Sequence, residues 1–166
     1  MTATAFAEMA EGSIPDLWPV CLDLYATFYQ QNAPHSALQF IPVLQKLAAI
    51  DQAEVERFLR HPETRHVLIE HDWLKVVLIH WQPGKISSIH GHPQGGCVFK
   101  VLQGSLEELR YTTDASPKLL AVSTYQAGSM AYIDDRMGYH AVGNPFHTAA
   151  ISLHVYTPGK KTRQSA

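Results

Sequence analysis

Hydrophobic and polar positions follow two different patterns along the chain, and the change lies near Pro62. Before it, apolar side chains recur every three or four residues, which is typical of amphipathic helices. The clearest such stretch runs from Trp18 to Phe28, with Asp16 as a candidate N-cap and Asn32-Ala33-Pro34 as its end. This pattern predicts the first helix.

Two further helical patterns follow before Pro62. One begins near Pro42 and continues through Leu44 and Leu47 to Ile50. The next covers 53–59, where Asp51 is placed as the N-cap and Glu54 as the partner in a capping box. We therefore expect two or three short helices in an N-terminal region, 1–62, that packs on the rest of the fold.

After Pro62 the apolar positions come in short continuous or alternating runs bounded by turn residues, as in β-strands. The predicted strands are 66–70, 75–81, 97–103, 105–111, 119–125, 130–133, 140–142 and 148–156. No helical pattern lies between them, so the mainly β fold should be a sandwich or barrel rather than a parallel α/β sheet. The barrel is expected over 63–158, followed by a tail at 159–166.

Composition excludes several classes of protein. The chain of 166 residues has 46% apolar and 17% charged residues, which fits one folded domain rather than a disordered chain. The formal net charge of −2 argues against a nucleic-acid-binding protein, because such proteins carry an excess of Lys and Arg. No apolar run reaches the roughly 20 residues of a membrane helix, so we expect no membrane partner. The N-terminus lacks a basic n-region and only two cysteines are present, so a reducing, cytoplasmic location is expected.

Candidate chemistry centres on the sequence His90-Gly91-His92. Histidines two residues apart on an extended segment project to the same side, where their imidazoles form a pair of nitrogen donors for a first-row metal. Taken alone, this pair fits an exposed turn equally well. The neighbouring residues add to the pattern, since Gly84 precedes the pair and Cys97 follows it.

These positions resemble the two motifs of the cupin superfamily, whose fold is a double-stranded β-helix (jelly-roll) barrel. The first motif, G-x5-H-x-H-x(3,4)-E-x6-G, is matched from Gly84 through the histidine pair to Gly104, with Cys97 in place of the glutamate. The second is matched by His140 and Asn144. The resemblance implies that His140 is a third metal ligand.

The cysteine at the glutamate position points to one family within the cupin superfamily. Segments 87–107, 138–144 and 151–158 are similar to those of cysteine dioxygenases. In that family three histidines bind one ferrous iron, and a cysteine is joined to a tyrosine by a thioether bond. The resemblance implies Fe²⁺ on His90, His92 and His140, with Cys97 and Tyr156 as the cross-linked pair.

The same resemblance assigns further site residues. Ser152 and His154 match a relay that orients the tyrosine hydroxyl, Arg65 matches the arginine that pairs with the substrate carboxylate, and Trp81 matches a tryptophan at the substrate site. Taken singly, His154 also fits a core histidine, Cys97 a buried small hydrophobe and Arg65 a surface ion pair. The chain departs from the family at Glu63, where a tyrosine is common, and at Gly91, where an acidic residue is common.

The expected function is therefore a non-heme iron thiol dioxygenase that converts L-cysteine and O₂ to cysteine sulfinate. A thiolate substrate would itself supply the negative charge that a glutamate ligand otherwise brings. Alternatives are a dioxygenase of another small thiol, such as 3-mercaptopropionate or cysteamine, and a metal-binding cupin with isomerase, hydrolase or ligand-sensing function. In bacterial mercaptopropionate enzymes a glutamine tends to occupy the position of Arg65, so the arginine favours an amino-acid substrate.

Overall fold

The computed structural model describes residues 14–29, 36–47 and 50–158. Its elements are η1 (Pro15–Leu17), α2 (Trp18–Tyr29), η2 (Ala37–Phe40), α3 (Ile41–Gln45), α4 (Gln52–Leu59), β1 (Arg65–Glu70), β2 (Lys75–Trp81), β3 (Cys97–Gln103), β4 (Ser105–Tyr111), β5 (Leu119–Gln126), β6 (Met130–Ile133), β7 (Tyr139–Gly143) and β8 (Ala150–Tyr156). The predicted helix end at 32–34 and the predicted tail at 159–166 lie outside the described residues. Within them, no helix is both long and apolar enough to cross a bilayer.

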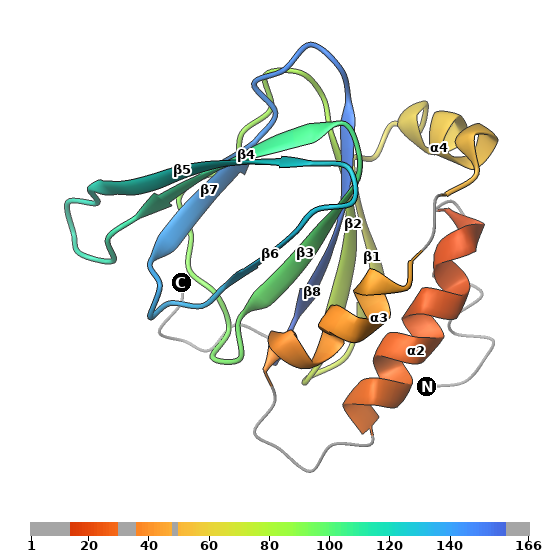
Figure 1. The fold of residues 1–166 in the computed structure, drawn as a ribbon, viewed down its shortest axis with the longest axis horizontal. Helices are drawn as coiled ribbons and strands as arrows, with labels where there is room; N and C mark the ends of the chain where they lie inside the picture. The colour runs from red at the N-terminus through yellow and green to blue at the C-terminus, as the bar shows by residue number, and fades with distance from the viewer. Residues whose placement is uncertain (1–13, 30–35, 48–49, 159–166) are drawn as a thin grey trace.

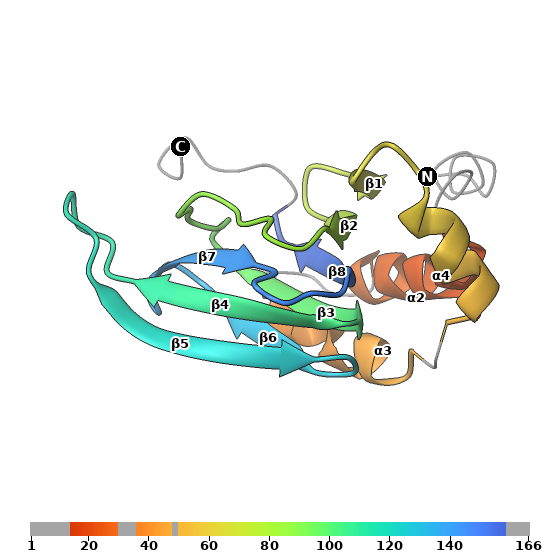
Figure 2. The same ribbon diagram turned by 90° about the horizontal axis from the view of Figure 1, so that it is seen from above.

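The strands form two antiparallel sheets that lie against each other (Figures 1 and 2). One sheet has the order β1-β2-β8-β3-β6 and the other the order β5-β4-β7. Single bridges join Ile86 to Gly143 and His90 to His140, so the loop before β3 runs along the outer edge of β7. Each predicted strand is present, with bounds within two residues of those expected. The fold is mainly β, as the sequence predicts.

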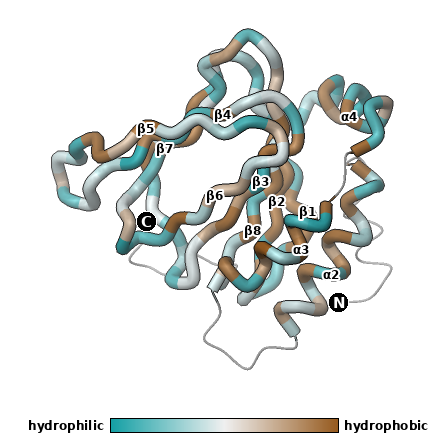
Figure 3. Tube along the Cα trace, in the orientation of Figure 1, coloured by the Kyte–Doolittle hydropathy of each residue, from teal (hydrophilic) through white to brown (hydrophobic). Residues whose placement is uncertain are grey.

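Two hydrophobic clusters hold these layers together. The larger one joins the helices to the outer face of the five-stranded sheet and includes Leu24, Phe40, Phe58, Val76 and Leu153. Figure 3 shows hydrophobic residues gathered where the helices face β1, β2 and β8. The smaller cluster fills the space between the two sheets, from Trp81, Phe99, Val101, Leu106, Val142 and Ala150. The five-stranded sheet is therefore buried on both faces, and the inner face can carry a site.

The N-terminal helices differ in detail from the prediction. Asp51 caps α4 as expected, since its Oδ1 accepts from the backbone N–H groups of Ala53 and Glu54. The return bond of a capping box is replaced by contacts with Asp16, which donates its N–H to Glu54 and accepts the N–H of Asp51. Asp16 is not an N-cap, because Pro15 begins a 3-10 turn one residue earlier.

The second helix is shorter than its apolar pattern predicts, since α3 ends at Gln45. Lys100, buried on the outer face of β3, donates from Nζ to the Leu44 carbonyl at 2.7 Å and to the Leu47 carbonyl at 3.2 Å. A cation at the carbonyl end of a helix is favourable, because these carbonyls have no partners within the helix. A contact distant in sequence thus stabilises the end of α3.

Candidate metal centre

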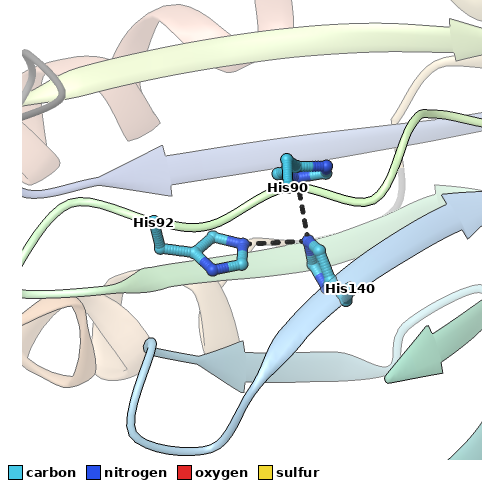
Figure 4. A group of neighbouring side chains, drawn as sticks. All are labelled: His90, His92 and His140. Atoms are coloured by element: carbon cyan, nitrogen blue, oxygen red, sulfur yellow. Dashed lines mark hydrogen bonds between the residues drawn. The ribbon is translucent and has the colours of Figure 1, made fainter. Parts of the chain in front are cut away.

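Three histidine side chains converge between the two sheets (Figure 4). His140 extends from β7, while His90 and His92 come from the loop that crosses it. The Nε2 atom of His140 lies 2.9 Å from that of His92 and 3.1 Å from that of His90. His92 and His140 are 2% exposed, so a ligand held by these nitrogens would be largely shielded from water. The structure brings together the three residues expected to bind metal.

The other ring nitrogens of these histidines face hydrogen-bond acceptors. His90 Nδ1 lies 2.8 Å from the carbonyl oxygen of Ser88, and His140 Nδ1 lies 2.7 Å from Glu108 Oε2. His92 Nδ1 is 3.5 Å from Asp135 Oδ1, which also accepts the backbone N–H of His92 at 2.7 Å. Acceptors at Nδ1 keep the proton on that atom and leave the Nε2 lone pair for a metal. The rings of His90 and His140 are therefore held in the ligating tautomer, and His92 lies close to the Asp135 carboxylate.

The spacing of the Nε2 atoms also fits a metal. With metal–nitrogen bonds of about 2.1 Å, ligands at 90° to each other are about 3.0 Å apart, whereas tetrahedral ligands are about 3.4 Å apart. The separations from His140 Nε2, 2.9 Å to His92 and 3.1 Å to His90, match neighbouring ligands at 90° in an octahedron. Such an arrangement leaves the opposite positions for exogenous ligands, as in the two-histidine, one-carboxylate oxygenases. The residues present fit a catalytic rather than a closed structural metal.

A second histidine group lies between α4 and β1, formed by His61, Glu63 and His66. It is more exposed, and both rings bind the backbone of Glu63. His61 Nδ1 accepts the Glu63 N–H at 3.2 Å, and His66 Nε2 lies 3.1 Å from the Glu63 carbonyl. These bonds stabilise the turn that leads into Arg65. They give His61 and His66 a structural role.

Cys97 and Tyr156 are direct partners across the β3–β8 ladder, so their side chains project from the same face of the sheet. Cys97 is fully buried. Burial raises the pKa of its thiol above the ordinary range, although a hydrogen bond with Tyr156 acts in the opposite direction. Burial likewise raises the pKa of the Tyr156 phenol, and the charge of Cys97 adds to the rise. Both groups are protonated at neutral pH.

Ser152 and His154 lie on the same face of β8 as Tyr156, four and two residues before it. The Trp81 indole N–H donates to Ser152 Oγ at 2.8 Å, and Ser152 Oγ lies 2.7 Å from His154 Nε2. An indole N–H is only a donor, so the serine proton finds its acceptor in His154 Nε2. The proton of His154 is then on Nδ1, which faces Cys97 Sγ at 4.0 Å.

This chain differs from the expected relay at its end. The resemblance implies that Ser152 and His154 orient the Tyr156 hydroxyl, but His154 Nδ1 faces the Cys97 sulfur, and the His154 and Tyr156 rings stack with centroids 6.1 Å apart. Burial lowers the pKa of His154 to about 3, with the charges of His140, Arg65 and His90 acting in the same direction. His154 is therefore a neutral ring at physiological pH.

Arg65 and Trp81 have different positions at the site. Arg65 is exposed at the start of β1, in the same cross-sheet row as Ile79 and Ser152, and its charge lowers the pKa of both His154 and Tyr156. Trp81 is 5% exposed and packs in the inner cluster. Its indole supports Ser152, whereas Arg65 acts on the inner-face groups through its charge.

Two acidic residues at the centre have no counterpart in the two cupin motifs. Glu108 is 6% exposed on β4, bonded to His140 and to the Tyr125 hydroxyl. Asp135 follows β6 and holds His92. Glu108 stands two residues after the inward-facing Leu106, so strand alternation alone would have placed its carboxylate inside. Asp135 lies in a turn, where no periodic signal exists.

Comparison with known proteins decides between the cupin families. The family model for cysteine dioxygenase type I matches residues 21–165. The chain belongs to the cysteine dioxygenase type I family. This match confirms the resemblance inferred from the sequence motifs, and it includes the helices as well as the barrel.

Individual relatives agree with the family match. Cysteine dioxygenase type 1 of Danio rerio is 33% identical over 115 residues, which is 65% of this chain and 57% of the fish protein. The rat enzyme is 29% identical over 151 residues, 75% of this chain and 76% of the rat protein. A Klebsiella pneumoniae protein with a double-stranded β-helix domain aligns with a TM-score of 0.50 and 25% identity, covering 61% of this chain and 83% of that one. The cupin barrel predicted from the motifs is confirmed.

Proposed function

We propose that this protein is a mononuclear iron thiol dioxygenase that oxidises L-cysteine with O₂ to cysteine sulfinate in the reducing cytoplasm. One observation carries the proposal: three histidine Nε2 atoms converge, no carboxylate of the described residues joins their group, and Cys97 and Tyr156 are partners on the adjoining sheet. A metal-bound thiolate supplies the negative charge that such a ligand set lacks. Thiols therefore suit this site better than neutral substrates do.

The proposed cofactor is Fe²⁺ on His90, His92 and His140. When bound, ferrous iron would supply the one-electron chemistry that activates O₂ and would favour the thiolate form of the substrate. The protein contributes the orientation of the rings, through acceptors at Nδ1 of His90 and His140 and through Asp135 beside His92. It also excludes water, because two of the three ligands are almost fully buried.

Arg65 is proposed to select the substrate. Its guanidinium is planar and permanently charged, and it forms paired hydrogen bonds with a carboxylate. Its charge already reaches the inner-face groups His154 and Tyr156. L-Cysteine and 3-mercaptopropionate carry the required carboxylate, whereas cysteamine does not. The family match and the arginine together favour the amino acid.

Tyr156 is proposed to direct its hydroxyl toward the substrate and O₂, while Trp81, Ser152 and His154 hold the surrounding structure. The proposed thioether joins Cys97 Sγ to a ring carbon of Tyr156. Its formation removes one S–H and one C–H hydrogen, and the two protons and two electrons pass to O₂. The chain therefore becomes lighter by about 2 Da. The bond would fix the phenol, so Cys97→Ser should slow turnover without abolishing it.

Metal analysis combined with oxygen uptake tests this proposal. Protein loaded anaerobically with Fe²⁺ should hold one ion per chain and consume O₂ with L-cysteine, and His140→Ala should lose both properties. Nickel and zinc must be excluded by analysis, because nitrogen ligands bind them more tightly than ferrous iron. Full activity in protein stripped of metal would refute the iron mechanism.

A comparison of two thiols tests the substrate assignment. Arg65→Ala should reduce kcat/KM for L-cysteine far more than for cysteamine, since only L-cysteine carries a carboxylate, and a hydrogen bond to a charged group contributes about 1.5–3 kcal/mol. Lys85→Ala, an exposed cation on the loop before β3, is the matched control and should affect neither substrate. Equal losses for both thiols would show that Arg65 does not contact a carboxylate.

A further inference from the structure

Glu108 is a buried carboxylate beside the metal centre, and both of its oxygens are engaged. Oε2 lies 2.7 Å from His140 Nδ1, and Oε1 accepts the Tyr125 hydroxyl at 3.2 Å. The side chains of His140 and Glu108 are 3% and 8% exposed. Burying a carboxylate costs free energy unless a charged or hydrogen-bonding group compensates it, so the two contacts are what keep Glu108 stable inside the fold.

The geometry excludes one role for Glu108. A general base must reach the proton of a bound substrate. Glu108 lies behind His140, on the side of the ring away from the three Nε2 atoms, because it binds Nδ1. It therefore acts on the centre only through the imidazole.

The other two ligands have weaker support at Nδ1. His90 faces a neutral carbonyl, and Asp135 lies 3.5 Å from His92 and is substantially exposed, with 39% of its side chain accessible. The His140–Glu108 contact is shorter and buried, so its charge is screened least by water. A carboxylate at Nδ1 orients the ring and makes its other nitrogen a more basic ligand.

We propose that Glu108 is a positioning residue that holds His140 and supplies, through its imidazole, negative charge to a metal centre whose own ligands are all neutral. The proposal rests on the proposed metal site. Cys97 occupies the position where the cupin motif has an acidic ligand. Glu108 returns one carboxylate to the centre without occupying a coordination position, which leaves that position for substrate or O₂.

The Tyr125 hydroxyl contacts Oε1 of Glu108 at 3.2 Å, whereas His140 is bound by Oε2. The Tyr125 ring packs edge-on against Phe99, at 5.5 Å between centroids, and Phe99 stacks on His154 at 5.0 Å. Removing the hydroxyl leaves the Glu108 charge and the bond to His140 intact. Tyr125→Phe is therefore the matched control for packing around Glu108.

Metal affinity tests the proposal independently of turnover. Co²⁺ is titrated into metal-free protein against a competing chelator, and the visible spectrum of the bound ion is recorded. Glu108→Gln keeps an oxygen acceptor for the Nδ1 proton but removes the charge. We expect affinity to fall about 10- to 100-fold, as for other supporting partners of metal-bound histidines, with a shifted spectrum. Tyr125→Phe should stay within about threefold of the unchanged chain.

The outcomes separate this inference from the proposed function. Glu108→Asp keeps the charge but retracts it by one methylene, so this variant should bind Co²⁺ more tightly than Glu108→Gln. If the glutamine variant does not fold, Glu108→Asp takes its place in the test. Equal affinity and identical spectra for the Glu108 variants and the unchanged chain would overturn the inference. Altered affinity in a protein that consumes no O₂ with any thiol would support Glu108 and refute the dioxygenase.

Discussion

Ser152→Ala perturbs the hydrogen-bonded chain that organises the inner face. Ser152 is fully buried, accepts the indole N–H of Trp81 and bonds His154 Nε2. Alanine fits the same space but removes both contacts. The variant leaves one buried donor and one buried acceptor without a partner.

The expected cost follows from these two groups. Each buried polar group left unsatisfied costs about 1–3 kcal/mol. The loss is offset in part, because alanine no longer buries a hydroxyl. We therefore expect a decrease of about 2–4 kcal/mol in the free energy of unfolding, a substantial share of the 5–15 kcal/mol typical of a domain. His154 should also become less well oriented toward Cys97.

Urea unfolding of metal-free protein provides the assay. Ser116→Ala, in the exposed β4–β5 loop, is the control and should change stability by less than about 0.5 kcal/mol. Trp81→Phe combined with Ser152→Ala should be non-additive, with a coupling energy of about 0.5–3 kcal/mol. A change below about 0.5 kcal/mol for Ser152→Ala, or strict additivity with Trp81→Phe, would refute the proposed chain of bonds.

Three further perturbations test other parts of the structure. A hydrogen bond from Arg136 lowers the pKa of Asp134 to about 2. The ionised carboxylate therefore contributes its full share to the free energy of unfolding above the ordinary carboxyl pKa, and this contribution is lost as pH falls through 2. Asp134→Asn should therefore cost about 2 kcal/mol in urea unfolding at pH 7 and about half of that at pH 3, and a constant difference would contradict this. Lys100→Met should lower the unfolding free energy by about 1–3 kcal/mol through the lost bonds at the end of α3, whereas exposed Lys118→Met should be neutral. Gly91→Asp would place a Cβ 2.8 Å from the Tyr139 ring and 3.1 Å from the Asp135 carboxylate, so Co²⁺ affinity should fall at least tenfold; unchanged affinity would show that the loop adapts.

The strands were predictable because each short apolar run is bounded by turn residues that also end the strand. Gly104 illustrates this, since it has φ +71°, and a Cβ there would lie 2.6 Å from the Ala149 carbonyl oxygen. The helical region was less predictable. The end of α3 depends on Lys100, and the contacts of Asp16 with Asp51 and Glu54 join segments more than thirty residues apart. Local periodicity contains no information about such contacts.

In the site, too, features set by local sequence spacing were predictable, whereas contacts between distant segments were not. The clustering of His90, His92 and His140 was predictable because such histidines recur at fixed spacings in a family, and strand alternation puts Ser152, His154 and Tyr156 on one face. Asp135 reaches His92 across 43 residues from a turn. The direction of His154 Nδ1 toward sulfur depends on packing between strands, which spacing does not determine.

Labelled oxygen tests the central claim most directly. Iron-loaded protein is supplied with L-cysteine under ¹⁸O₂ in ordinary water, and the product is analysed by mass spectrometry. The expected product is a sulfinate that carries two ¹⁸O atoms, with His140→Ala as the inactive control. A product with one labelled atom or none, or disulfide as the only product, would contradict the assignment of this three-histidine centre as a thiol dioxygenase.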